Sequence, residues 1–275
     1  MYRASFRRTL LPALFCFLVS LLMPYAFAQG FGASDQIQIA PPMRQVQAPP
    51  KDASASELEK QGDDLRSSKQ YLDAIDYYQA ALEKAPQNPA ICNKLGISEL
   101  MLQRFKEAGK EFQRSIKGDP KFAEAYNNLG VIQYERRKYG SAVKQYKKAL
   151  VLQPDSASFY SNLGAAYFAR KDFEHATQAY AKAVQLDPEI FERTSHTGIA
   201  AQMASPEDRA HYDYVLAKLY AKIGDRDHSL EFLRKSMEEG YKDVKNVYTD
   251  PEFAELRKDA RFAELMKEKP VAIPE

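Results

Sequence analysis

The residues that could support catalysis or bind a metal are few and scattered. None of the histidines stands at a spacing typical of metal ligands or of a nucleophile and its base: His175, His196, His211 and His228. The sequence has no serine elbow after a strand and no phosphate-binding glycine loop. The acidic pairs Asp63-Asp64 and Glu238-Glu239 fall on expected helix surfaces or ends, where solvation explains them. We therefore expect no enzymatic activity, no cofactor and no metal site.

Thiol chemistry is equally restricted, because the chain has only two cysteines. Cys16 lies in an apolar segment near the N-terminus. Cys92 lies in a pattern that repeats along the chain, at the place where later units carry Tyr126 and Tyr160. Free cysteine packs like a small apolar side chain, so we interpret Cys92 as a buried packing residue. The alternative is a redox-sensitive or intermolecular thiol.

A pattern of glycine, alanine, aromatic residue and proline repeats along the chain with a fixed period. Four glycines recur at one constant interval: Gly62, Gly96, Gly130 and Gly164. Each is followed at a fixed separation by an alanine and, four places after the alanine, by an aromatic residue: Tyr78, Phe112, Tyr146 and Tyr180. A small residue comes three places later, and each unit closes with a proline: Pro86, Pro120, Pro154 and Pro188.

Within one unit, apolar and small residues recur at helical spacing on two segments, 123–136 and 139–152 in the third unit. This predicts two antiparallel helices, with glycine and alanine where the helices cross and an aromatic ring in the wider gap. Proline ends the second helix because it has no N–H group to donate. One pair cannot bury its apolar face alone, so neighbouring pairs must stack into an all-α solenoid.

The pattern resembles the tetratricopeptide repeat, whose 34-residue period and small, aromatic and proline places agree with it. The tryptophan usual near the start of the unit is replaced by Cys92, Tyr126 and Tyr160. The resemblance implies a right-handed α-solenoid of antiparallel helix pairs over residues 55–188, a superhelix whose first helices line a concave groove.

After Pro188 the period breaks. We expect an insertion loop at 189–205 and a degenerate fifth helix pair at 206–240, with Ser205 and Asp208 in a capping box and Ala217 in the glycine's place. In the segment 241–275, the sequence Phe-Ala-Glu-Leu occurs at 253–256 and again at 262–265. This segment is expected to cover the last apolar face.

The N-terminal segment has the features of an export signal. Arg3, Arg7 and Arg8 precede an uncharged run from Leu10 to Phe27, with small residues flanking a cleavage site before Gln29. We expect a signal peptide at 1–28 and a location in a bacterial periplasm; an uncleaved membrane anchor is the alternative. Residues 29–54 are rich in proline and glutamine and are expected to form a disordered tether.

Net charge argues against a nucleic-acid partner. Removing three arginines takes the basic residues from 39 to 36 against 37 acidic residues, so the expected mature chain carries a charge of −1. Without a basic excess, binding to phosphates has no electrostatic support.

The resemblance also assigns residues to the concave groove. Its expected middle is apolar and amide-rich and comes from the second to fourth units: Asn93, Ile97, Leu100, Met101, Asn127, Asn128, Val131, Tyr134, Ser161, Asn162 and Phe168. An acidic end is expected in the first unit and a basic end in the fifth: Ser56, Glu59, Asp63, Arg66, His211, Tyr214, Lys218 and Lys222. The family's carboxylate clamp is absent, because its places hold other residues: Glu59, Asp63, Lys94, Glu124 and Asn128.

Such an apolar middle left in water would form an unusually large patch. Three explanations remain open: a partner peptide binds there, the tether or the insertion covers it, or neighbouring helices bury it. Asn128 and Asn162 either bind the backbone of an extended peptide or have a structural role. We expect a protein-interaction scaffold; the alternatives are a non-catalytic subunit of an envelope enzyme and a solenoid that self-associates through its ends.

Overall fold

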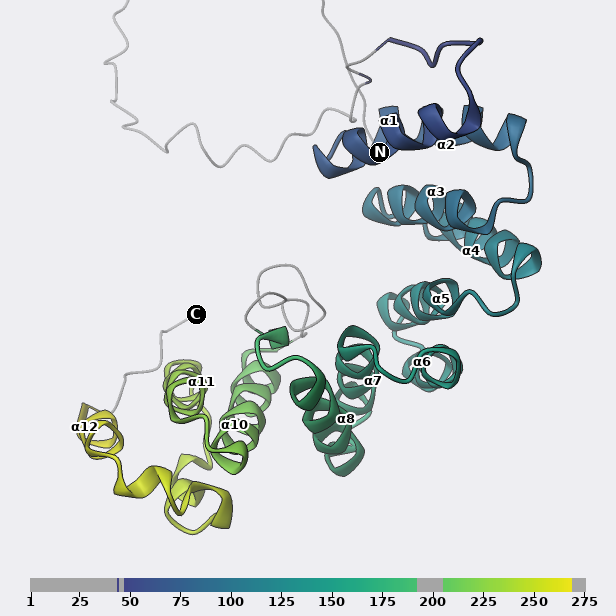
Figure 1. Ribbon diagram of the computed structural model, residues 1–275. Helices are drawn as coiled ribbons and strands as arrows, with labels where there is room; N and C mark the ends of the chain where they lie inside the picture. Colours follow the sequence, from purple (N-terminus) through teal and green to yellow (C-terminus); the bar gives the residue numbers. More distant parts are fainter. Residues whose placement is uncertain (1–43, 45–46, 192–204, 269–275) are drawn as a thin grey trace, which may run out of the picture. The chain divides into compact units, whose positions relative to one another are not determined.

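The computed structural model describes residue 44 and residues 47–191 and 205–268 (Figure 1). The expected signal peptide, most of the tether and most of the insertion lie outside these residues. Within the described ranges the regular structure is helical, with no strand. No helix there combines the length and the apolar character needed to cross a membrane.

Residues 55–186 form four pairs of helices that follow one another along the chain (Figure 1). Within each pair the two helices pack closely, and each second helix packs against the next first helix. The first helices are α1 (Ala55–Ser67), α3 (Pro89–Met101), α5 (Ala123–Glu135) and α7 (Ala157–Ala169). The second helices are α2 (Tyr71–Lys84), α4 (Phe105–Gly118), α6 (Tyr139–Leu152) and α8 (Phe173–Leu186). The predicted segments 123–136 and 139–152 are thus confirmed to within one residue.

The repeating glycines lie where the two helices of a pair cross. A Cβ atom added at any of the four would come within 2.7 Å of the repeated aromatic ring of the same unit. The rings themselves are fully buried: Tyr78, Phe112, Tyr146 and Tyr180. Glycine is therefore required by the close approach of the ring, as the sequence pattern predicts.

The fifth pair consists of α10 (Pro206–Ile223) and α11 (Arg226–Glu238). Ser205 caps α10 by accepting a hydrogen bond from the Asp208 N–H, and Gly224 ends the helix with a φ of 84°. Ala217 occupies the glycine's place and Leu233 occupies the place of the repeated aromatic ring; both are fully buried. In place of the repeated alanine, Ser229 donates a hydrogen bond of 2.8 Å to the Ala217 carbonyl.

The fifth pair joins the fourth in a different way from the regular units. At a regular junction the end of one first helix lies beside the start of the preceding second helix, as Arg136 lies 6.0 Å from the Phe105 ring. Beside the start of α8, by contrast, lies the beginning of α10: the rings of Phe173 and His211 are 4.4 Å apart. At the other end, the Tyr220 hydroxyl donates a 2.7 Å hydrogen bond to the Pro188 carbonyl.

The two ends of α10 are therefore exchanged relative to a regular first helix. The sequence pattern predicted the pair but not this reversal. The end of α8 and the beginning of α10 are therefore separated by about the length of α8, whose 14 residues span about 21 Å. The sequence between Pro188 and Ser205 is longer than the connections between the regular units, which is sufficient for this separation.

The C-terminal segment packs against the fifth pair. It contains three short 3-10 helices, η2 (Val244–Tyr248), η3 (Pro251–Phe253) and η4 (Leu256–Lys258), and a final helix, α12 (Ala260–Glu268). The repeated Phe and Leu residues are all buried: Phe253, Leu256, Phe262 and Leu265. The two phenylalanines thus belong to the core, and their rings are not available for self-association.

The end of the segment expected as a tether contacts the first unit. Arg44 pairs with Asp76, the Tyr77 hydroxyl donates to the Gln47 carbonyl, and Lys84 donates to the Lys51 carbonyl at 2.9 Å. These partners all lie on α2. The described part of this segment therefore runs along a second helix, away from the first helices that were expected to line the groove.

Candidate functional site

The structure buries much of the predicted groove. Asn93, Asn127, Tyr134 and Phe168 are all less than 9% exposed. Ile97, Leu100 and Val131 are half-buried, as are Asn128, Ser161 and Asn162. Met101 is the exposed member of the predicted set, at 53%. Of the three explanations, burial by neighbouring helices therefore accounts for Tyr134 and Phe168, and the accessible apolar residues of the set lie on α3 and α5.

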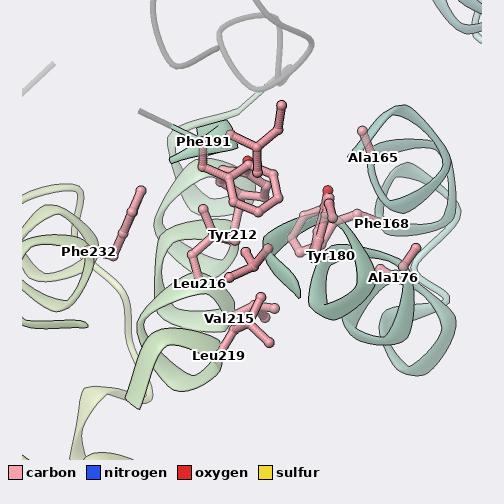
Figure 2. Close-up of a cluster of buried hydrophobic side chains, with 14 of the residues drawn as sticks. Ala165, Phe168, Ala176, Tyr180, Phe191, Tyr212, Val215, Leu216, Leu219 and Phe232 are labelled. Atoms are coloured by element: carbon pink, nitrogen blue, oxygen red, sulfur yellow. The ribbon is translucent and has the colours of Figure 1, made fainter. Parts of the chain in front are cut away.

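Aromatic side chains of α8 and α10 cover Phe168, a predicted groove residue of the fourth unit. The Phe168 ring lies 5.1 Å from Phe173, 5.4 Å from His211 and 5.9 Å from Tyr212. Figure 2 shows Phe168, Tyr180, Phe191 and Tyr212 directed toward one another between α7, α8 and α10. These rings meet edge to face, the arrangement that aromatic quadrupoles favour.

The asparagines bind one another. Asn162 donates to the Asn127 side chain at 3.0 Å, Asn127 donates to Asn128 at 3.3 Å, and Asn128 donates to Asn93 at 2.9 Å. This asparagine ladder connects α7, α5 and α3. The hydrogen bonds fix the register of neighbouring first helices, which favours the structural role for Asn128 and Asn162.

The acidic end of the predicted groove is neutralised. The Lys94 ammonium group lies 2.7 Å from Glu59 and 2.6 Å from Asp63, and Arg66 also approaches Asp63 at 3.7 Å. Burial alone would lower the pKa of Lys94, but hydrogen bonds to the two carboxylates outweigh it and raise that pKa. Lys94, in the place of the clamp asparagine, thus connects the first unit to the second.

The four residues predicted for the fifth unit do lie together, in a cleft of about 590 Å³. The cleft lies between α8, α10 and the segment 241–252, and we call it the α8–α10 cleft. Its lining from α10 includes His211, Tyr214, Lys218 and Lys222 together with Val215 and Leu219. Its other walls come from α8 and the C-terminal segment: Phe173, Glu174, Thr177, Gln178, Ala181, Tyr241, Asn246, Asp250 and Glu252.

Charge in the cleft is largely paired on one side. Lys218 lies 3.0 Å from Asp250 and 3.4 Å from Glu252, and the Tyr214 hydroxyl donates to Asp250 at 2.9 Å. Burial, followed by that hydrogen bond, raises the pKa of Tyr214. The predicted basic end is therefore neutralised at Lys218, while Lys222 is exposed at the mouth.

His211 stands between this cleft and a smaller one of about 340 Å³, which is also lined by Lys171, Asp208 and Lys242. Burial lowers the pKa of His211, the Lys171 charge adds to this effect, and Asp208 and Asp243 oppose it. The imidazole is therefore kept neutral near pH 7. It packs between Phe173 and Tyr241 as an aromatic ring, at 4.4 and 5.5 Å.

Sequence reasoning missed the α8 wall of the cleft. Phe173, Glu174 and Gln178 lie on a second helix, which in a regular array does not face the next first helix in this way. The one signal in the sequence is the break of period after Pro188, which marks an irregular junction.

Other candidate chemistry is limited in the described part of the chain. Cys92 is free and fully buried, as the packing interpretation predicts, and burial raises the pKa of its thiol. No cluster of three or more His, Cys, Asp or Glu residues suited to a metal ion occurs among residues 44, 47–191 and 205–268.

Comparison with known proteins identifies the repeats. Sequence models described as "Tetratricopeptide repeat" match residues 65–132 and 157–190, and one described as "TPR repeat" matches residues 134–169. No curated protein sequence gives a significant match.

Several solved structures are similar in fold. The TPR protein TTC0263 of Thermus thermophilus is 21% identical, with 78% of this chain and 100% of that chain covered and a TM-score of 0.48. MamA 41-end from Desulfovibrio magneticus RS-1 is 19% identical, with 71% and 97% covered and a TM-score of 0.48. YrrB, described as a TPR protein with an unusual peptide-binding site, is 16% identical, with 71% and 91% covered and a TM-score of 0.46.

Together the matched models cover residues 65–190 except residue 133. The helix pairs, the glycines at the helix crossings and the 34-residue period agree with these matches. This chain is a tetratricopeptide repeat protein.

Proposed function

We propose that this chain is an exported protein-interaction scaffold that holds an extended segment of a partner protein in the α8–α10 cleft. The observation that carries the proposal is the cleft itself, of about 590 Å³, a volume within the range of sites that hold small ligands or a few side chains. Its role is binding rather than catalysis.

The lining of the cleft suits a peptide. Half-buried Phe173 and Ala181 offer apolar surface, and exposed Gln178 and Asn246 offer amide groups that can both donate and accept hydrogen bonds. A peptide backbone needs such partners when it leaves water. Lys222 at the mouth adds one exposed positive charge, which favours an acidic residue in the bound segment.

A second contact region of the same scaffold is the accessible remainder of the predicted groove on α3 and α5. Met101 on α3 is 53% exposed, and Ile97 and Leu100 on the same helix and Val131 on α5 are half-buried. An apolar side chain of the partner would remove this surface from water.

The experiment is site-specific photo-crosslinking in intact cells that export the full chain. A photoreactive residue replaces Gln178, which lines the cleft, or Gln185, an exposed residue of the same helix outside it. We expect one partner segment to be crosslinked from position 178 and not from 185. Gln178→Trp should abolish that partner's binding, whereas Gln185→Trp should leave it intact.

Equal crosslinking from both positions, or loss of binding in both tryptophan variants, would move the site away from the cleft. The groove is tested separately with Met101→Lys and a matched control, Val151→Lys, whose side chain is 82% exposed on α6. Weaker binding in the Met101 variant alone would support the second contact region.

Export is tested on the same cells. We expect the purified chain to begin at Gln29 in N-terminal sequencing and to fractionate with the periplasm. A chain that keeps the segment 1–28 and sediments with membranes would support the anchored alternative. An enzyme as stoichiometric partner in the crosslinked complex would identify the chain as an accessory subunit.

A further inference from the structure

The four regular units have two sets of connecting segments, at opposite ends of the helices. Segments 68–70, 102–104, 136–138 and 170–172 connect the two helices of one unit, and we call them the inner turns. Segments 85–88, 119–122, 153–156 and 187–191 follow the second helices, and we call them the outer turns.

The two sets carry opposite charge. The inner turns contain seven basic residues and one acidic residue, Asp172, for a net charge of +6: Lys69, Arg104, Arg136, Arg137, Lys138, Arg170 and Lys171. The outer turns contain one basic residue, Lys121, and four acidic residues, for a net charge of −3: Asp119, Asp155, Asp187 and Glu189. The whole chain has a net charge of only +2, so the basic residues are concentrated at this edge.

The inner turns have the same geometry and lie at one edge of the array. In each, the first N–H after the C-cap donates to the carbonyl three residues earlier and the next N–H to the carbonyl five residues earlier, as in Arg137 to Tyr134 and Lys138 to Gln133. The asparagine ladder sets neighbouring first helices side by side in register. Packed helices are about 10 Å apart, so the charges of successive turns lie about one Debye length from each other.

One residue of each inner turn has a left-handed backbone conformation, and in all four turns it has a long polar side chain. Its φ is positive, between 57° and 62°, at Lys69, Gln103, Arg137 and Lys171. Glycine or asparagine adopts this conformation at less cost. At the same position the fifth pair has Gly224, followed by Asp225, so the basic feature belongs to the regular units.

The reversed α10 ends the basic edge. Asp208, in the first turn of α10, pairs with Lys171. Arg104 pairs with Glu99 at 3.2 Å, and Arg136 lies over Phe105. All seven basic side chains are exposed, and the highest density of charge lies in the third unit.

We propose that the inner-turn edge binds the surface of an anionic phospholipid bilayer. The inner turns of the third and fourth units belong to neighbouring helix pairs and together hold five of the seven basic residues, so one surface can contact both turns. A half-buried aromatic residue begins each following helix: Tyr71, Phe105, Tyr139 and Phe173. Basic residues with neighbouring aromatic rings are the combination found at membrane interfaces, where each Lys or Arg near an anionic surface adds to binding.

The test is flotation of the full exported chain with vesicles of phosphatidylcholine alone or of equimolar phosphatidylcholine and phosphatidylglycerol. The turn variant combines Arg136→Gln, Arg137→Gln, Lys138→Gln and Arg170→Gln. The matched control combines Lys110→Gln, Lys117→Gln, Lys121→Gln and Lys144→Gln, which are exposed positions outside the inner turns with the same change in net charge. Circular dichroism establishes that both variants are folded.

We expect the wild-type chain and the control to float with the anionic vesicles only, and the turn variant to lose about tenfold or more of its partition coefficient at low salt. Raising the salt concentration should release the wild-type chain. Absence of binding to anionic vesicles, or equal loss in both variants, would overturn the proposal. So would turn-dependent binding to polyglutamate without binding to vesicles, because it would assign the edge to an acidic polypeptide. The crosslinking experiment at Gln178 does not depend on these residues. Absence of vesicle binding would therefore not contradict the proposed peptide site in the α8–α10 cleft.

Discussion

In the four regular units a glycine on the first helix faces an aromatic ring on the second, whereas in the fifth pair Ala217 and Leu233 occupy the same two places. The larger residue on one helix accompanies a smaller one on the other. The space where two helices cross is thus filled in both regions, although by different residues. This shows that the local rule of the repeat is conservation of volume, which permits either pair.

The same two regions differ in how they join their neighbours. Between regular units the asparagine ladder and Lys94 set the register, and the first helices stack in the same direction. Between the fourth and fifth pairs the contact is aromatic, through Phe168, Phe173, Tyr180, His211 and Tyr212, and α10 enters from the opposite end. Reversal of one helix opens the α8–α10 cleft, so the irregular junction is also the binding region that we propose.

The largest expected effect comes from uncovering the reversed pair. Phe253 is fully buried and its ring lies 5.6 Å from Tyr214 on α10. We expect Phe253→Ala to destabilise the fifth pair by about 4 kcal/mol, because a large buried ring is replaced by a cavity. Hydrogen exchange should accelerate in α10 and α11 and remain slow in α3 to α6.

The matched control is Phe105→Ala, in which a half-buried ring of a regular unit is removed. It should cost less and act on α4 and α5. Uniform acceleration of exchange along the whole chain in the Phe253 variant would mean that the two regions unfold as one unit.

The second prediction exchanges the crossing residues of the two regions. Gly130→Ala would place a Cβ atom 2.5 Å from the Tyr146 ring, and we expect a loss of about 2 to 3 kcal/mol. Tyr146→Leu alone should also destabilise, because it leaves a cavity. The double variant reproduces the Ala217 and Leu233 combination and should cost less than the sum of the two by about 1 to 2 kcal/mol. Urea denaturation of all four proteins measures this coupling, and strict additivity would contradict conservation of volume as the rule.

The sequence alone predicts the regular units well and their junctions poorly. The period places all eight regular helices because glycine, ring and proline each act within one unit. The groove is a property of several units at once. Tyr134 and Phe168 have the spacing of groove residues, yet burial of Phe168 depends on His211 and Tyr212, which approach only because α10 is reversed. Nothing in the spacing of α10 encodes its direction; the length of the insertion before it is the remaining clue.

The third prediction concerns a buried acid of the fifth pair whose pKa is raised. Asp213 on α10 is 9% exposed, and burial, followed by the Glu239 carboxylate, raises its pKa to about 7, against the opposing charges of Lys235 and Arg209 and with a smaller contribution from Glu231. The folded chain therefore holds a proton that the unfolded chain releases near pH 4. The contribution of the protonated Asp213 to the free energy of unfolding is fully present below about pH 4 and is lost as the pH rises through about 7.

We expect Asp213→Asn to remove this decline and to stabilise the fifth pair by about 2 kcal/mol at pH 8, since a neutral amide avoids the cost of a buried charge. Urea denaturation at pH 4 and pH 8 measures the difference between wild type and variant. A variant that is less stable than the wild type at pH 8 would mean that the ionised carboxylate is favourably paired there, contrary to the raised pKa.

The smallest effect is expected in the asparagine ladder, which the regular units have and the fifth pair lacks. Asn127 accepts a hydrogen bond from Asn162 and donates one to Asn128, so Asn127→Ala removes two bonds and Asn162→Ala removes one. We expect losses of about 1 to 2 kcal/mol and about 1 kcal/mol respectively. Because the ladder holds α3, α5 and α7 in register, hydrogen exchange should accelerate in these helices and stay unchanged in α10. A change in α10 of equal size would mean that the register of the regular units is transmitted through the aromatic junction, which the reversed packing argues against.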